Sequence, residues 1–143
     1  MQRVPGSCRW MDMDHVKSEA KDLRSDHSGP QLEHERLEVY PLALRLHAEA
    51  CGLLPRRDNR ALRNQLERAS LSVVLNIAEG AGRRSSPDKR RFYEIARGST
   101  TETAAIVDVI SARRLAAPSR CADVRVLAVR VVQMLTRLGG PPR

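Results

Sequence analysis

Apolar residues recur every three or four positions in four successive segments of the chain, and this period constrains its fold more than any other feature. The spacing predicts helices over about 36–53, 60–79, 87–114 and 120–138. No segment shows the strict alternation that indicates a strand. Four amphipathic helices with short connections predict an all-α protein, an antiparallel up-down-up-down four-helix bundle.

Each predicted helix carries a stripe of residues that we expect to face the core. The stripe of 36–53 consists of Leu37, Tyr40, Leu44, His47, Ala48 and Cys51, and that of 60–79 of Leu62, Leu66, Ala69, Val73, Asn76, Ile77 and Gly80. The stripe of 87–114 consists of Phe92, Ile95, Ala96, Ser99, Thr103, Ile106 and Ile110, and that of 120–138 of Val124, Leu127, Val131, Met134, Leu135 and Leu138.

Helix boundaries are marked by the residues that favour caps and turns. Ser85, followed by Pro87 and Asp88, predicts a capped helix start with an acid near the positive end of the helix dipole. Gly80 and Gly82 predict the end of the second helix.

The second helix has a further apolar flank beside its core seam. A helix that is hydrophobic on two faces needs two neighbours, one within its own fold and one in another subunit. We therefore expect an oligomer whose interface includes this flank, which consists of Leu71, Val74, Leu75 and Ala78.

The ends of the chain differ in character from the helical segments. Residues 1–34 hold five basic and six acidic side chains without an apolar period, which predicts a solvated tail before a domain at 35–139. A short C-terminal tail follows at 140–143, and Met11 and Met13 are alternative translation starts to Met1. No apolar run reaches the length of about 18 residues that suits a membrane helix, and the start has no apolar signal region. The expected location is the cytoplasm.

The chain is strongly basic, with a formal charge of +8 and 25 Lys and Arg residues. Such a balance points to anionic partners such as nucleic acid, although a genome that favours arginine codons would give the same composition. The basic residues gather around both ends of the second helix, where we expect phosphate contacts. These candidates are Arg56, Arg57, Arg60, Arg63, Arg83, Arg84, Lys89, Arg90 and Arg91.

The segment 65–102 contains the string NIAEG-x-G-R, at Asn76 to Arg83, followed by IARGS at Ile95 to Ser99. It resembles the four-helix-bundle family encoded in intervening sequences of 23S ribosomal RNA genes. The resemblance implies a homopentamer and no enzymatic activity. It also implies a relation to the accessory variability protein of diversity-generating retroelements, which binds a reverse transcriptase and nucleic acid. Many members have proline two residues before the asparagine, where this chain has Val74.

Polar residues on the second and third helices form the remaining candidate site. A polar side chain on an apolar seam must find a partner, because burying it unpaired costs about 1–3 kcal/mol. We expect a structural polar layer that fixes the register of the two helices, with a small-ligand site as the alternative. Its members are Asn76, Glu79, Arg97, Ser99 and Glu102, with Arg83 beside Glu79.

Catalytic and metal motifs are absent from the sequence. There is no Glu-x-x-His pair of the di-metal bundles, no G-x-S-x-G nucleophile motif, and no Gly-Lys pair of a phosphate loop. A helix-turn-helix reading would need shorter helices and a shorter turn. We therefore expect no cofactor and a non-enzymatic, oligomeric interaction protein that associates with RNA or ribonucleoprotein. A scaffold for a protein partner, such as a reverse transcriptase, is the alternative.

Overall fold

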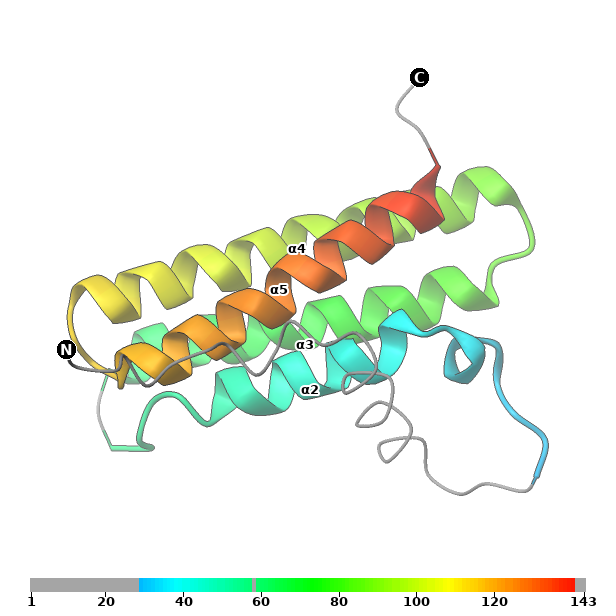
Figure 1. The fold of residues 1–143 in the computed structure, drawn as a ribbon. Coiled ribbons are helices and arrows are strands. Elements are labelled where there is room, and N and C mark those ends of the chain that lie inside the picture. Colours follow the sequence, from blue (N-terminus) through cyan, green and yellow to red (C-terminus); the bar gives the residue numbers. More distant parts are fainter. Residues whose placement is uncertain (1–28, 58, 141–143) are drawn as a thin grey trace, which may run out of the picture. The chain divides into compact units, whose positions relative to one another are not determined.

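The computed structural model describes residues 29–57 and 59–140, and the helices within them lie side by side (Figure 1). They are the 3₁₀ helix η1 (Glu33–Arg36) and the α-helices α2 (Val39–Cys51), α3 (Arg60–Gly82), α4 (Ser86–Ala112) and α5 (Pro118–Gly139). No strand occurs in this part of the chain. The expected tail at 1–34, including Met11 and Met13, and the C-terminal tail at 140–143 lie almost wholly outside the described residues.

Each long helix packs against two others, so that the four enclose one core. Helix α3 packs on α2 and α4, and α5 packs on α4 and α2. This arrangement confirms the predicted all-helical class with four helices. The helices begin and end within three residues of the predicted positions.

The predicted seams of α3 and α5 are largely confirmed. Leu66, Val73 and Ile77 of α3 are almost completely buried, as are Val124 and Val131 of α5. The outermost predicted positions are less covered, since Leu138 at the end of α5 stays 42% exposed.

The predicted stripe of α2 is wrong. Leu44 and Ala48 are exposed, whereas the buried face is formed by Val39, Leu42, Ala43, Leu46 and Ala50. Because apolar residues surround α2 on most sides, spacing alone did not fix which face turns inward. The orientation follows instead from packing on α3 and α5.

The core face of α4 is rotated slightly from the predicted one. Ala96, Thr103, Ile106 and Ile110 are buried as expected, but Ile95 is exposed. The missed core residues are Tyr93, Thr100 and Val107. Thr100 and Thr103 are tolerated because each hydroxyl donates a hydrogen bond to the carbonyl oxygen four residues earlier, at 2.8 Å in both cases.

The predicted start of α4 is confirmed in detail. The Oγ of Ser85 accepts a hydrogen bond from the backbone N–H of Asp88 at 3.2 Å, and donates to the Asp88 carboxylate at 2.6 Å. Pro87 lies in the first turn, where its missing N–H has no helical partner to lose.

Gly80 is buried in the seam of α3 as predicted, and Gly82 is the last residue of the helix as predicted, but the prediction that Gly80 also ends the helix is wrong. Helix α3 continues through Gly82, and Gly80 lies against α4 instead of ending the helix. A Cβ atom at Gly80 would lie 2.8 Å from Cε1 of Tyr93 and 3.0 Å from Cβ of Phe92. The glycine therefore permits the close approach of α3 and α4.

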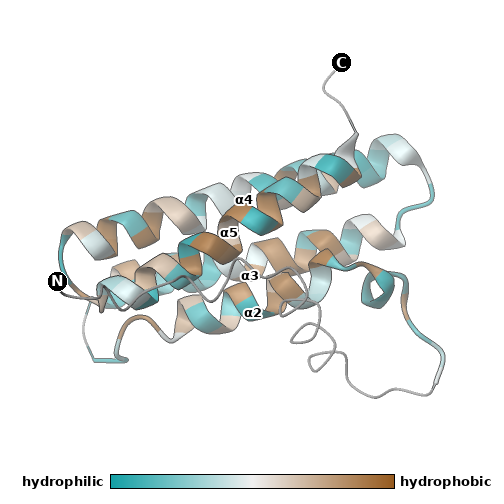
Figure 2. Ribbon diagram, viewed as in Figure 1, coloured by the Kyte–Doolittle hydropathy of each residue, from teal (hydrophilic) through white to brown (hydrophobic). Residues whose placement is uncertain are grey.

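Hydrophobic and hydrophilic residues are interspersed along each helix (Figure 2). None of the helices in the described residues combines the length and the apolar character that crossing a membrane requires.

Candidate nucleic-acid interface

The first predicted basic cluster lies where α2 leads into α3. Arg56, Arg57 and Arg60 are exposed. Arg63 is half-buried, and its Nη1 donates a hydrogen bond to the carbonyl oxygen of Arg56 at 2.7 Å. Arg63 therefore holds the connection between the helices, and three of the four arginines remain available to a partner.

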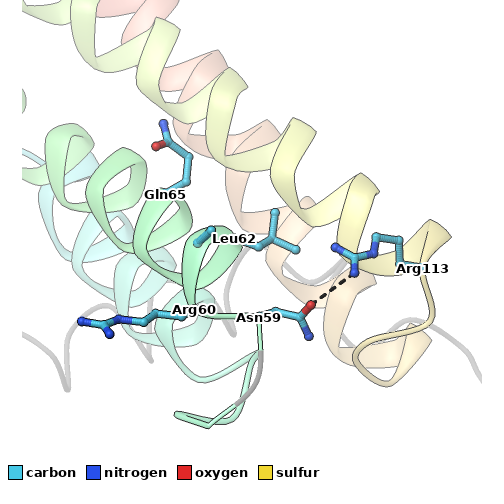
Figure 3. A pocket seen from close by; sticks show the side chains of 6 residues that line it. Asn59, Arg60, Leu62, Gln65 and Arg113 are labelled. Carbon is cyan, nitrogen blue, oxygen red and sulfur yellow. Dashed lines mark hydrogen bonds between the residues drawn. The ribbon is translucent and has the colours of Figure 1, made fainter.

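Two arginines that the sequence analysis missed lie close to this cluster. The Nη2 of Arg113, at the end of α4, donates a hydrogen bond to Oδ1 of Asn59 at 3.2 Å (Figure 3). The guanidinium of Arg120, in the first turn of α5, lies beside Gly52, where a Cβ atom would be 3.0 Å from its Nη2. The signal that could have found them is the folded-back topology, which brings the α4–α5 connection next to the α2–α3 connection.

An open pocket of about 520 Å³ lies between the first turns of α3 and the last turn of α4. Leu62 and Ala61 give it apolar walls. The Arg113 guanidinium reaches toward Asn59, whereas Arg60 points away from Asn59 (Figure 3). The pocket is lined by Asn59, Arg60, Ala61, Leu62, Gln65 and Arg113.

The second predicted cluster surrounds the connection between α3 and α4. Arg83 forms an ion pair with Glu79 one turn earlier, and its guanidinium carbon lies 4.8 Å from the centroid of the Phe92 ring. Arg84 and Arg91 are exposed, whereas Lys89 and Arg90 are half-buried. Arg83 thus serves the helix junction, and the freely accessible charge here is smaller than the sequence suggests.

In place of the expected polar layer, the structure has individual hydrogen bonds at different heights along α3 and α4. Ser72 and Ser99 join α3 to α4 through their hydroxyls at 2.8 Å. Asn76 donates to the carbonyl oxygen of Ser72 at 2.8 Å and to its hydroxyl at 3.1 Å. Nearer the start of α3, Gln65 donates to the Glu102 carboxylate at 2.6 Å.

The other predicted members of the layer lie apart from these bonds. Glu79 pairs with Arg83, which directly follows the same helix. Arg97 is exposed, and its carbonyl oxygen accepts a hydrogen bond from Thr101. The structure brings Ser99 to α3 directly and Glu102 through Gln65, and it does not gather the five residues into one site.

A small polar cluster between α2 and α3 escaped the sequence analysis. Nδ1 of His47 lies 2.8 Å from Oγ of Ser70, which is fully buried, and 3.6 Å from Sγ of Cys51. Burial and the nearby charge of Glu67 raise the pKa of the Cys51 thiol. A raised pKa keeps the thiol protonated near neutral pH, which is unfavourable for a nucleophile.

The predicted oligomer flank is only partly exposed. Leu71 and Leu75 are 40% and 57% exposed, and Ala78 is half-buried. Val74, in contrast, is 6% exposed and belongs to the core, so its inclusion in the flank was wrong. Val74 follows Val73 by 100° around the helix, so the buried face of α3 is wide enough to include both.

No group of three or more His, Cys, Asp or Glu side chains that could hold a metal ion occurs in the described residues. The exposed groups of the interface are guanidinium groups, which suit the recognition of anions.

The family model for the 23S rRNA-intervening sequence protein matches residues 35–137, from the end of η1 almost to the end of α5. No curated protein matches the chain.

Proposed function

The chain belongs to the 23S rRNA-intervening sequence protein family, and from this premise we propose a non-enzymatic, oligomeric protein that associates with RNA or ribonucleoprotein. The observation that carries the proposal is the surplus of exposed arginines at the helix ends, in a chain with a formal charge of +8. Arginine binds phosphate oxygens through a planar set of donors and keeps its charge at any physiological pH.

The RNA contact is electrostatic and independent of sequence. Aromatic residues make up 3% of the chain, Tyr93 is buried, and the Phe92 ring packs against Arg83. Base-stacking platforms are therefore scarce among the described residues, and phosphate contacts supply the affinity.

The proposed assembly is a homopentamer of antiparallel up-down-up-down bundles. The short connections at 83–85 and 113–117 support the antiparallel arrangement, because they leave room only for a reversal of direction. Exposed Leu71 and Leu75 support self-association, since large apolar side chains on an outer helix face favour a partner helix.

The non-enzymatic role and a cytoplasmic location complete the proposal. The polar side chains between α3 and α4 are engaged with one another, as in the Ser72–Ser99 and Gln65–Glu102 hydrogen bonds. Cys51 and Cys121 are free thiols, as is usual in a reducing compartment.

Binding of labelled single-stranded and duplex RNA of mixed sequence over a salt series tests the proposal. We expect both to bind at low salt and to weaken together as salt rises, with little preference among sequences. Absence of binding at low salt would contradict it.

A protein partner, such as a reverse transcriptase, is the second candidate. Val126 and Val129 on the outer face of α5 favour it, being 40% and 49% exposed. Capture of a protein by the tagged chain that survives nuclease treatment would support the scaffold role.

A further inference from the structure

The two ends of the bundle differ in charge when each is taken as its connections and the adjoining helical turns. At one end, residues 48–63 and 109–121 contain seven arginines and two acidic residues. At the other, residues 33–42, 79–91 and 136–140, which include Arg90 and Arg91, contain seven basic and five acidic residues. We call the first the arginine end; its arginines are Arg56, Arg57, Arg60, Arg63, Arg113, Arg114 and Arg120.

The arginine end is one continuous surface made of two connections far apart in the sequence. The hydrogen bond from Arg113 to Asn59 joins the end of α4 to the start of α3. Arg120 beside Gly52 joins the start of α5 to the end of α2. In Figure 1 both connections lie at the same end of the helices. Six of the seven arginines are exposed, Arg63 being the exception.

Two backbone positions at this end adopt a conformation that favours glycine. Asn59 and Arg114 both have φ of 53°, and they are the positive-φ residues other than glycine among the described residues. Arg114 follows the last turn of α4, where the N–H of Leu115 reaches the carbonyl oxygen of Ile110 at 3.0 Å. Glycine is the usual residue at such a helix end, so an arginine here retains a charge at a conformational cost.

The exposed arginines of this end belong to both connections and to the helical turns beside them. Arg60 points away from Asn59, whereas the Arg113 guanidinium reaches toward Asn59 and donates a hydrogen bond to it (Figure 3). Cations distributed over two connections suit a polyanion with many charges along its length, such as a nucleic-acid backbone.

We infer that the arginine end, and not the α3–α4 connection, is the surface that binds the RNA backbone. This inference rests on the proposed function and assigns it to one place on the bundle. It adds Arg113, Arg114 and Arg120 to the interface. It excludes Arg83, whose guanidinium pairs with Glu79.

The test compares two double variants that each remove two exposed positive charges. R60Q/R114Q alters the arginine end, and R84Q/R91Q alters the α3–α4 side. Binding of a labelled single-stranded 20-nucleotide RNA is measured for both and for the unmodified chain over a salt series. We expect R60Q/R114Q to weaken binding about tenfold and to reduce the salt slope by about 1.4, as two lost phosphate contacts would. R84Q/R91Q should change the affinity less than about threefold.

The outcomes distinguish the assignment to the arginine end from the proposal that the chain binds RNA at all. Equal losses in the two double variants, or a larger loss in R84Q/R91Q, would overturn the assignment to the arginine end while leaving RNA binding intact. No binding by the unmodified chain would overturn the proposed function itself. Poly-glutamate serves as a polyanion without nucleotides. If it displaces the RNA when both are present at the same concentration of negative charges, the surface binds any polyanion, and the assignment to RNA is overturned.

R114G separates binding from folding. Glycine relieves the positive φ at this position, so the variant should keep or raise its melting temperature while it weakens RNA binding. Undiminished binding by R114G, together with undiminished binding by R60Q/R114Q, would exclude Arg114 from the interface.

Discussion

The missing side chain at Gly80 determines how closely α3 approaches α4. In G80A the new methyl group would meet the Tyr93 ring at 2.8 Å and Phe92 Cβ at 3.0 Å, so the helices must separate. We expect a loss of about 1–3 kcal/mol in the free energy of unfolding, measured by urea denaturation.

The control for this change is Gly98, within α4, where a Cβ atom would meet nothing within 4 Å. G98A should stabilise the protein by about 0.5–1 kcal/mol, because alanine is the better helix former. A G80A variant as stable as G98A would mean that the helix contact at Gly80 is looser than the structure gives.

The backbone conformation of Arg114 also lowers the stability of the folded protein. A left-handed conformation of a residue with a Cβ atom costs about 1 kcal/mol, which glycine avoids. R114G should therefore raise the free energy of unfolding by about 1 kcal/mol. R113G, at a neighbouring position with φ of −84°, is the matched control and should be destabilising.

At the scale of the helix, the start of α4 depends on one hydroxyl. S85A removes the acceptor for the N–H of Asp88, and a lost cap of this kind costs about 1 kcal/mol. S86A changes the adjacent serine, the first residue of α4, and should have a smaller effect. Thermal unfolding followed by circular dichroism would compare the two, and equal effects would argue against the cap.

The buried faces of some helices could be predicted from the sequence, and those of others could not. In α3 and α5 apolar residues recur at every third or fourth position along one continuous seam, so the period located Val73 and Val131 in the core although both helices also carry exposed apolar residues. In α2 the apolar residues lie on most sides, and only packing on α3 and α5 selects the buried face. Short-range signals such as the Ser85 cap were found because they depend on neighbouring residues alone.

The candidate interface was partly predictable for a related reason. Clusters of consecutive basic residues, such as Arg56 and Arg57, are visible in the sequence. The contact between Arg113 and Asn59 spans 54 positions, and it depends on how the helices fold back on one another. The burial of Val74 likewise depends on its neighbours in space, because the core face of α3 and its outer flank adjoin.

At the scale of the whole molecule, the exposed flank of α3 connects the fold to assembly. Leu71 and Leu75 are the large apolar side chains of this flank, and covering them in a subunit interface would remove apolar surface from water. Val74 lies beside them in the sequence but contributes to the core of its own bundle. A substitution at Leu75 therefore tests the stability of the assembly, whereas a substitution at Val74 tests the stability of the subunit.

L75E should release subunits from the oligomer while preserving the helical circular dichroism signal, because a glutamate at this exposed position remains in water in the monomer. V74E should instead unfold the subunit, because it places an unpaired carboxylate in the core. Light scattering gives the mass of each variant, and circular dichroism its folding. If the unmodified chain already scatters as one subunit at micromolar concentration, the exposed leucines do not form a stable interface between copies. The proposed homopentamer would then be excluded, and RNA affinity would have to come from the cations of a single bundle.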